Sequence, residues 1–427
     1  APLAVELPYG ALPDRAPMMP DPDSVQNQVE GIAKRLGRVV PAADPDLVAE
    51  LTQFVREWLD LHLRPLQSIM TLEEWLAGTT YNETRKRDLR AIYDRIVGRG
   101  LARLPRHYCT KVSSFVKREA YDVYKHARWI NSRSDYFKVY SGPAFKSIEN
   151  IVYGVHHFIK HVPVPERPAA IAALVQPGAR YCATDYRSFE AHFTPELMRA
   201  LELQLYRHML SNFPEISHTI CNTISGDNHA STRAHVKFSL KGRRMSGDMC
   251  TSLGNGFSNL MLWLFACHKL GSRSDGFVEG DDGIFAIYDG PVPDAGFFER
   301  LGWTIDIIEH EDPSAASFCG VVCAEGQVIK DPRDVLRTFA WSMTQPEASL
   351  KVRKQLLRAK ALSLAYELPQ CPIAGALARR AIQLTEGVEP RFVNDGYHVR
   401  PKLTDIPPFQ PTAALRALFA QKYGIGV

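Results

Sequence analysis

GFVEGDDGIFAIY, residues 276–288, contains two short apolar runs on either side of a Gly-Asp-Asp-Gly sequence. Apolar strands separated by such a turn are typical of a β-hairpin. Gly280 and Gly283 allow the turn to be tight and a substrate to approach the backbone closely. The hairpin would therefore present Asp281 and Asp282 at its tip. By itself, however, a turn of this composition is common on solvated surfaces.

A third carboxylate, Asp185, lies upstream in ATDYRSFEAHF at 183–193. Phosphoryl transfer requires a site that neutralises charge on the attacking and leaving oxygens, and two divalent ions about 3.5–4 Å apart do this. Mg²⁺ prefers a few carboxylates together with water and substrate phosphate. An aspartate at the end of one strand, beside an aspartate pair in an adjacent hairpin, supplies that arrangement. If the three side chains converge, Asp185, Asp281 and Asp282 are candidates for a catalytic site that holds two Mg²⁺ ions, with Mn²⁺ as a substitute.

The composition is that of an ordinary globular protein with a large core: 427 residues, 45% hydrophobic and 23% charged. The formal net charge is only +4, so any nucleic-acid-binding surface must be a local basic patch. No run approaches the roughly 18 apolar residues that span a bilayer. The N-terminal sequence has neither the basic nor the apolar region of a signal peptide, and we expect no such segment.

Eight cysteines in 427 residues are too few for a disulfide scaffold and favour a reducing compartment. Two groups have some features of a zinc site: Cys319 and Cys323 with His310, and the pair His157 and His161. Neither contains the paired CxxC of typical zinc modules. Burial of free cysteines and ordinary packing of the histidines are the alternative interpretation, and zinc is left open.

Apolar spacing and helix-start residues predict helices at 45–66, 82–98, 194–210, 251–265 and 345–386. Both ends of the chain are Pro-rich, and we expect an extended N-terminal arm at 1–25 and an extended tail at 388–427. The tail carries aromatic residues that could support a base or fill a channel, or simply pack on the outside of the molecule: Phe392, Tyr397, Phe409, Phe419 and Tyr423.

The order of three segments changes the interpretation of the acidic turn. ATDYRSFEAHF, RRMSGDMCTSLGNG at 243–256 and VEGDDGIF at 278–285 resemble motifs A, B and C of positive-strand RNA virus RNA-dependent RNA polymerases. They are most similar to those of the tombusvirus, carmovirus and nodavirus-like group. The resemblance extends over roughly residues 110–330. Motif C is GDD, whereas reverse transcriptases typically have YxDD.

The resemblance implies an α+β right-hand polymerase with fingers, a palm containing a small antiparallel sheet, and a helical thumb. Fingers would comprise 26–180, with motif F at 115–130, and the palm 181–335 with motifs A–E. Residues 212–240 would return to the fingers. The thumb would comprise 336–387, followed by the tail. Asp185 and Asp281 would be the principal metal ligands and Asp282 a supporting one.

The resemblance also implies a nucleotide and ribose site. Glu190 occupies the place of the second motif A acid, where the family usually has Asp. Asn255 and Ser246 would complete a network that senses the 2′-hydroxyl, and such a polar site rejects a sugar that lacks it. Gly247 would belong to the flexible loop before the motif B helix. Thr251 and Asn255, four residues apart, would lie on one face of that helix and point at the nucleotide.

FVKREAYDVYKHARWI at 115–130 resembles motif F, the basic fingers element over the nucleotide entry path. Its basic residues would bind triphosphate or template phosphates, with Arg128 the best candidate for a forked contact; they are Lys117, Arg118, Lys125 and Arg128. SFCG at 317–320 resembles motif E, which makes Phe318 and Cys319 candidates for a primer-gripping hairpin. The segment equivalent to motif D lacks the expected lysine, and His310 is the nearest protonatable group.

These expectations describe an RNA-directed RNA polymerase that copies viral genomic RNA from NTPs by two-metal nucleotidyl transfer. Its partners would be the RNA template, the nascent RNA and NTPs. It would work in the host cytoplasm, in a membrane-associated replication complex held by a viral replication-membrane protein or another part of a precursor. Two alternatives remain at this stage: an inactive RNA-binding scaffold with the same fold, and a reverse transcriptase. Primer extension with NTPs and dNTPs distinguishes all three.

Overall fold

The computed structural model describes residues 3–10, 18–121, 123–324, 326–393 and 399–427. Its central element is a four-stranded antiparallel sheet in the order β7-β8-β4-β9. The strands are β4 (Arg180–Tyr186), β7 (Arg273–Glu279), β8 (Asp282–Asp289) and β9 (Ile305–His310). The predicted hairpin at 276–288 is confirmed as β7–β8, with strands slightly longer than the apolar runs.

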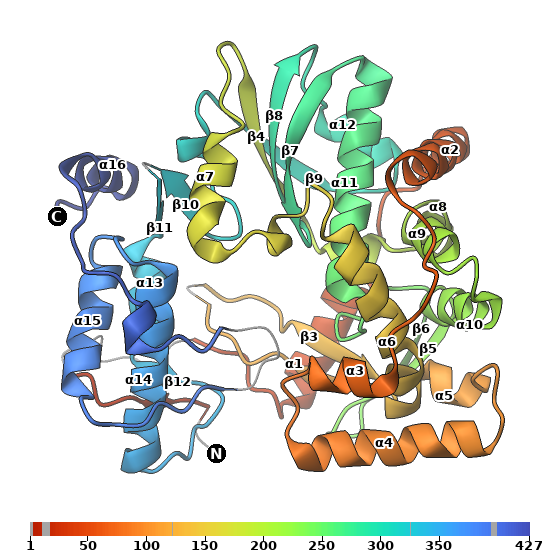
Figure 1. Ribbon diagram of the computed structural model, residues 1–427, viewed down its shortest axis with the longest axis horizontal. Helices are drawn as coiled ribbons and strands as arrows, with labels where there is room; N and C mark the ends of the chain where they lie inside the picture. Colours follow the sequence, from red (N-terminus) through yellow and green to blue (C-terminus); the bar gives the residue numbers. More distant parts are fainter. Residues whose placement is uncertain (1–2, 11–17, 122, 325, 394–398) are drawn as a thin grey trace.

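Both faces of the central sheet are buried, which explains why β8 is apolar without alternation. Phe285 and Ile287 belong to the main core, where Trp263 of α11 (Thr251–Leu270) stacks on Phe285 at 4.2 Å between ring centroids. Ile284 and Ala286 face the opposite side and share a smaller cluster with α7 (Arg167–Ala172). Figure 1 shows α11 and α7 on either side of the sheet.

A second four-stranded sheet has the order β3-β2-β5-β6. Its strands are β2 (Lys111–Val116), β3 (Trp129–Arg133), β5 (Asp227–Ser231) and β6 (Lys237–Lys241). The parallel pairing of β2 with β5 places residues 227–241 beside 111–133, although about a hundred residues separate them.

The helices beside these two sheets are α1 (Val25–Gly31), η1 (Ile32–Leu36), α2 (Pro45–His62), α3 (Leu72–Ala77), α4 (Glu83–Gly98), α5 (Arg106–Thr110), α6 (Asp135–Val152), η2 (Ile159–His161), η3 (Val164–Glu166), η4 (Phe189–His192), α8 (Pro195–Ala200), α9 (Glu202–Met209), α10 (Pro214–Ile224) and α12 (Ala295–Arg300).

The C-terminal part is mainly helical and lies apart from the second sheet in Figure 1. It contains η5 (Pro313–Ala315), β10 (Val322–Ala324), β11 (Gln327–Ile329), α13 (Pro332–Phe339), β12 (Trp341–Ser342), α14 (Leu350–Glu367), α15 (Ala374–Leu384), η6 (Leu403–Asp405) and α16 (Ala413–Tyr423). A separate hydrophobic cluster joins β10, β11, α13, α14, α15 and α16. In the described part of the chain, no helix has the length and apolar character to cross a bilayer.

Several local predictions need correction. The helix expected at 194–210 is two helices, α8 and α9, because Leu201 adopts a non-helical backbone between them. The helix expected at 251–265 continues to residue 270, where Gly271 caps it in the left-handed conformation. The helical region 345–386 is divided into α14 and α15.

The Pro-rich ends are more ordered than their composition indicates. Val5–Glu6 forms strand β1, which pairs with β12 near the C-terminal part of the chain. The tail is not extended throughout, because α16 forms at 413–423 and buries Leu415 and Phe419 in the C-terminal cluster. Tyr397 lies outside the described residues. These elements acquire structure because tertiary contacts bury their few apolar side chains.

Candidate active site

The structure brings the three predicted aspartates together at one end of the central sheet. In β4, Thr184 pairs with Gly283, so Asp185 is the next residue beside the turn of the β7–β8 hairpin. Glu279 pairs with Asp282, which leaves Gly280 and Asp281 as the two loop residues. Gly280 has φ +63°, the left-handed conformation that tight two-residue hairpins require. Asp185, Asp281 and Asp282 are each partly accessible to solvent as residues, although neighbouring protein atoms desolvate their carboxyl groups.

The backbone of this turn is held by Asn259, a fully buried side chain of α11. Its Nδ2 lies 3.3, 3.1 and 3.0 Å from the carbonyl oxygens of Gly280, Asp281 and Asp282. Gly283 permits close packing, because a Cβ atom there would lie 2.5 Å from the Thr184 hydroxyl. Asn259 was not identified from the sequence. Its position four residues after Asn255, on the same face of the helix, was the available signal.

The electrostatics of the aspartates indicate a site that needs cations. Burial raises the pKa of Asp282 to about 7, and repulsion from Asp281 and Asp185 adds to the effect. Burial also raises the pKa of Asp281, with a further contribution from Glu190. The pKa of Asp185 is raised by burial and by Asp306, its cross-strand partner on β9. Three neighbouring carboxylates whose charged forms are disfavoured by burial and by nearby acids are a suitable oxygen donor set for a hard divalent cation.

Two of the predicted ribose residues, Glu190 and Asn255, are each held by a buried or partly buried arginine. Arg35 of η1 lies 3.3 Å from Glu190. Arg244 donates through Nε to Asn255 Oδ1 at 2.8 Å, so the Asn255 amide N–H groups point away from this arginine. Arg244 also forms an ion pair of 2.8 Å with Glu202, and both side chains are completely buried. Neither arginine was identified from the sequence. Glu190 is 155 positions from Arg35, and no local sequence pattern pairs Arg244 with Asn255, 11 positions away.

The loop before α11 is bound to β3. Ser246 Oγ donates to the Trp129 carbonyl at 2.6 Å, and the Gly247 N–H donates to the Asn131 carbonyl at 3.0 Å. The Thr251 hydroxyl donates to the Asp248 carbonyl, in the loop before α11, at 2.8 Å. A contact of Thr251 with a nucleotide stays a prediction.

The four basic residues of the segment 115–130 have different surroundings. Lys117 and Arg128 both pair with Glu119, at 2.8 and 3.3 Å. Arg118 donates to the Met343 carbonyl at 3.2 Å, which connects this segment to the C-terminal part. Lys125 lies 6.0 Å from the ring centroid of Tyr121. Burial would lower the pKa of Arg128, but the charges of Glu119, Glu190 and Asp281 raise it, so this guanidinium lies near the aspartates.

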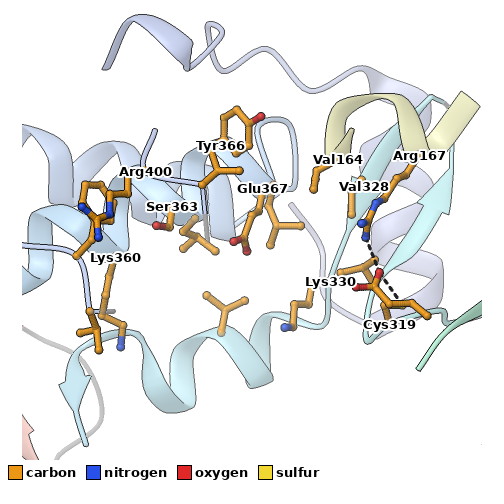
Figure 2. A pocket seen from close by; sticks show the side chains of 18 of the residues that line it. Val164, Arg167, Cys319, Val328, Lys330, Lys360, Ser363, Tyr366, Glu367 and Arg400 are labelled. Carbon is orange, nitrogen blue, oxygen red and sulfur yellow. Dashed lines mark hydrogen bonds and ion pairs between the residues drawn. The ribbon is translucent and has the colours of Figure 1, made fainter. Parts of the chain in front are cut away.

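A cavity of about 1270 Å³ extends from Asp282 and Glu279 into the C-terminal part. Figure 2 shows Arg167 and Cys319 at one end and Lys360 and Arg400 at the other. Among the described lining residues, basic side chains outnumber acidic ones; the basic ones are Arg118, Lys146, Lys160, Arg167, Lys330, Lys360, Arg391 and Arg400, and the acidic ones are Glu149, Glu279, Asp282, Asp334 and Glu367. Burial lowers the pKa of Lys360 to about 8, and this side chain donates to the carbonyls of Thr338 and Trp341. Such a surface favours a polyanion.

The candidates His310 and Cys319 lie at different distances from the aspartates. His310 pairs with Tyr181 on β4, whereas Asp306 pairs with Asp185. Four residues of strand at about 3.3 Å each place His310 about 13 Å from Asp185 along β9, so His310 is not a neighbour of the aspartates. Cys319 lies at a tight turn with φ +53°, and its thiol is 3.8 Å from Glu279. The predicted motif E residues Phe318 and Cys319 therefore lie beside the hairpin that carries Asp281.

The zinc alternatives are also corrected. In the described ranges, the one group of three or more His, Cys, Asp or Glu side chains with converging ligand atoms is His156, His157 and Asp275. Cys319 and Cys323 do not converge with His310, and His157 has His156 as its neighbour instead of His161.

Comparison with known proteins agrees with this geometry. The family model described as viral RNA dependent RNA polymerase matches residues 21–289. The RNA-directed RNA polymerase of Greasy grouper nervous necrosis virus is 29% identical over 191 residues, which are 40% of this chain and 18% of that protein. The RNA-directed RNA polymerase of Striped jack nervous necrosis virus is 28% identical over 214 residues, 47% of this chain and 21% of that protein. The matched region thus spans about a fifth of the length of these curated relatives.

Proposed function

The chain belongs to the viral RNA-dependent RNA polymerase family, and from this premise we propose that it copies an RNA template by two-metal nucleotidyl transfer from NTPs. The observation that carries the proposal is the convergence of Asp185, Asp281 and Asp282 at one end of the central sheet. Burial raises the pKa of all three, and further increases come from Asp306 for Asp185 and from neighbouring carboxylates for Asp281 and Asp282. A donor set of this kind fits Mg²⁺, with Mn²⁺ as a substitute.

Asp185 and Asp281 would be the principal ligands and Asp282 a supporting one. Two bound divalent ions would lower the pKa of the attacking 3′-hydroxyl and neutralise the triphosphate. The chain's own part is to hold the carboxylates in place. Asn259 contributes by binding three successive carbonyls of the turn, which fixes the backbone that carries Asp281 and Asp282.

The incoming nucleotide would lie between the aspartates and the basic segment 115–130. Arg128 is close enough to Asp281 and Glu190 for their charges to raise its pKa, and its planar fork suits a phosphate. Glu190 and Asn255 would bind the ribose hydroxyls. The contact from Arg244 fixes the Asn255 amide so that its N–H groups are available to an oxygen of the sugar.

The cavity beside Asp282 would hold template and nascent RNA, mainly through phosphate contacts, so that affinity falls with salt. In this scheme the central sheet is the palm, the second sheet with its helices is the fingers, and the helices after residue 335 are the thumb. Attachment to a membrane-associated replication complex in the host cytoplasm would require a partner such as a viral replication-membrane protein or another part of a precursor.

The test is primer extension on an RNA template, with NTPs and dNTPs compared. Asp281→Asn and Asp185→Asn should each lower nucleotide addition by several orders of magnitude while RNA binding is retained. Asp289→Asn is the matched control, because Asp289 lies at the opposite end of the same hairpin and is exposed. Activity within about tenfold of wild type in either active-site variant contradicts the metal assignment. Preference for dNTPs would indicate a reverse transcriptase, and no extension at all would indicate an inactive scaffold.

A further inference from the structure

A second group of ligand-type side chains lies away from the proposed catalytic aspartates. His156 and His157 follow the end of α6, and Asp275 lies on β7, four residues before the end of that strand. His156 Nε2 is 3.1 Å and 3.2 Å from the two carboxylate oxygens of Asp275. His157 Nδ1 is 3.3 Å from Asp275 Oδ1. The three side chains therefore point one nitrogen or oxygen each at a common centre.

Backbone contacts hold both sides of this group. The Val278 N–H donates to the His157 carbonyl at 2.9 Å, and Phe158 forms a parallel bridge with Val278. On the other side, the Gly276 N–H donates to Asp275 Oδ1 at 2.7 Å. The ring of His156 packs against Phe277 at 5.2 Å between centroids. The arrangement is consequently pre-organised by the sheet and does not depend on chance contacts between long flexible side chains.

The two separations from Asp275 are close to the edge of a small coordination tetrahedron, and the ligand atoms of all three residues lie within 4.8 Å of one another. Zinc bonds to imidazole nitrogen and carboxylate oxygen are about 2.0–2.2 Å long, which separates neighbouring ligand atoms by about 3.3 Å in a tetrahedron. The observed separations from Asp275 are 3.1 and 3.3 Å. We propose that His156, His157 and Asp275 form a zinc-binding site, with a water molecule as the fourth ligand.

The donor types favour zinc over magnesium, because Mg²⁺ prefers oxygen ligands throughout. The Asp275 carboxylate accepts a hydrogen bond from the Gly276 N–H at 2.7 Å and lies beside both imidazoles, so its oxygens are held in position as ligands. His157 Nδ1 also lies 2.9 Å from the Gly276 carbonyl oxygen. Zinc would bind the unprotonated Nδ1 atom in place of this contact, which leaves the ring proton on Nε2.

The consequence of zinc binding would be mechanical. The ion would join the connection after α6 to β7, the strand that leads into the turn bearing Asp281. Four residues of strand, about 13 Å, separate Asp275 from Glu279. The site would thus stabilise the base of the hairpin without contacting the nucleotide. The proposal stands on the geometry of these three residues and is independent of whether the chain polymerises RNA.

The experiment measures zinc content directly. The full chain is stripped with a chelator, dialysed against ZnCl₂ with excess Mg²⁺ to occupy the catalytic aspartates, and analysed by atomic mass spectrometry. We expect one zinc per chain in the wild type and its loss in His156→Ala and in Asp275→Asn. His161→Ala is the matched control and should retain the metal. Co²⁺ in place of zinc should give the intense visible absorption of tetrahedral coordination in wild type and control only.

A second measurement protects the test against misfolding. Zinc should raise the thermal unfolding midpoint of wild type and of His161→Ala, and leave that of Asp275→Asn unchanged. His156 is mostly exposed, at 60% of its side chain, so its replacement should not disturb the fold. A wild-type chain that retains no zinc, or variants that retain as much as wild type, would show that the three residues form only a hydrogen-bonded ion pair.

Discussion

Asp282→Asn should stabilise the metal-free protein at neutral and alkaline pH. The Asp282 carboxyl has its pKa raised from the ordinary 3.8 to about 7 by burial and by Asp281 and Asp185. Because the folded-state pKa is above the unfolded one, the ionised carboxylate opposes folding. This penalty is absent below about pH 4, grows between pH 4 and 7, and is constant above pH 7.

The size of the effect follows from that pKa. A change from 3.8 to about 7 corresponds to about 4 kcal/mol at most. Asp282 is exposed to solvent, and screening reduces the value, so we expect about 1–2 kcal/mol. The asparagine variant lacks the charge, and its advantage in unfolding free energy over wild type should therefore be about 1–2 kcal/mol at pH 8 and close to zero at pH 4.

The assay is urea unfolding of wild type, Asp282→Asn and the control Asp289→Asn in chelator, at pH 4, 6 and 8. Mg²⁺ should reverse the order at pH 8, since it binds the folded wild type through all three carboxylates and the variant through fewer. A variant that is less stable than wild type at pH 8 in chelator, or equally stabilised by Mg²⁺, would refute the argument that these carboxylates repel one another until a cation is bound.

Four further substitutions test the nucleotide site and the tail. Asn255→Ala should weaken discrimination against dNTPs more than it lowers NTP use, and an unchanged ratio of kcat/KM for NTP and dNTP would remove Asn255 from the ribose site. Arg244→Lys keeps the charge facing Glu202 but loses the Nε donor to Asn255, so discrimination should fall about tenfold, the value of one hydrogen bond; an unchanged ratio in a folded variant would contradict the positioning role. Arg128→Lys should raise the KM for every NTP because the fork is lost, and an unaltered KM in Arg128→Ala would mean that the residue is only a solvated charge. Phe392→Ala, in the tail segment that lines the cavity, should reduce primer-independent initiation and spare extension of an annealed primer; a parallel loss of both would show a folding role.

The substitution Phe392→Ala is a sharper test of the tail than its deletion. The composition of the tail indicates an extended segment that could be deleted from residue 400 onward. The structure shows that Leu415 and Phe419 of α16 are completely buried among the C-terminal helices. Deletion would expose this core and lower activity through stability alone. A single substitution at the cavity surface separates the two effects.

The sequence by itself determined the features that depend on neighbouring residues. Short apolar runs on either side of Gly280 and Gly283 specified the hairpin, and the helix-start sequence Thr194-Pro195-Glu196 specified where α8 begins. The segments 183–193, 243–256 and 278–285 occur in the order of polymerase motifs A, B and C. That resemblance was sufficient to expect the three aspartates to converge. These are local patterns, governed by turn conformation, capping and the period of the strand.

Tertiary structure alone decided which side chains hold those residues in place. Arg35 forms a hydrogen bond with Glu190, which is 155 positions away in the sequence. Arg244 forms a buried ion pair with Glu202. Asn259 meets the acidic turn because α11 packs on β7 and β8. No local pattern encodes such pairs, since a buried polar group takes whichever partner the packing of distant elements brings within hydrogen-bond distance.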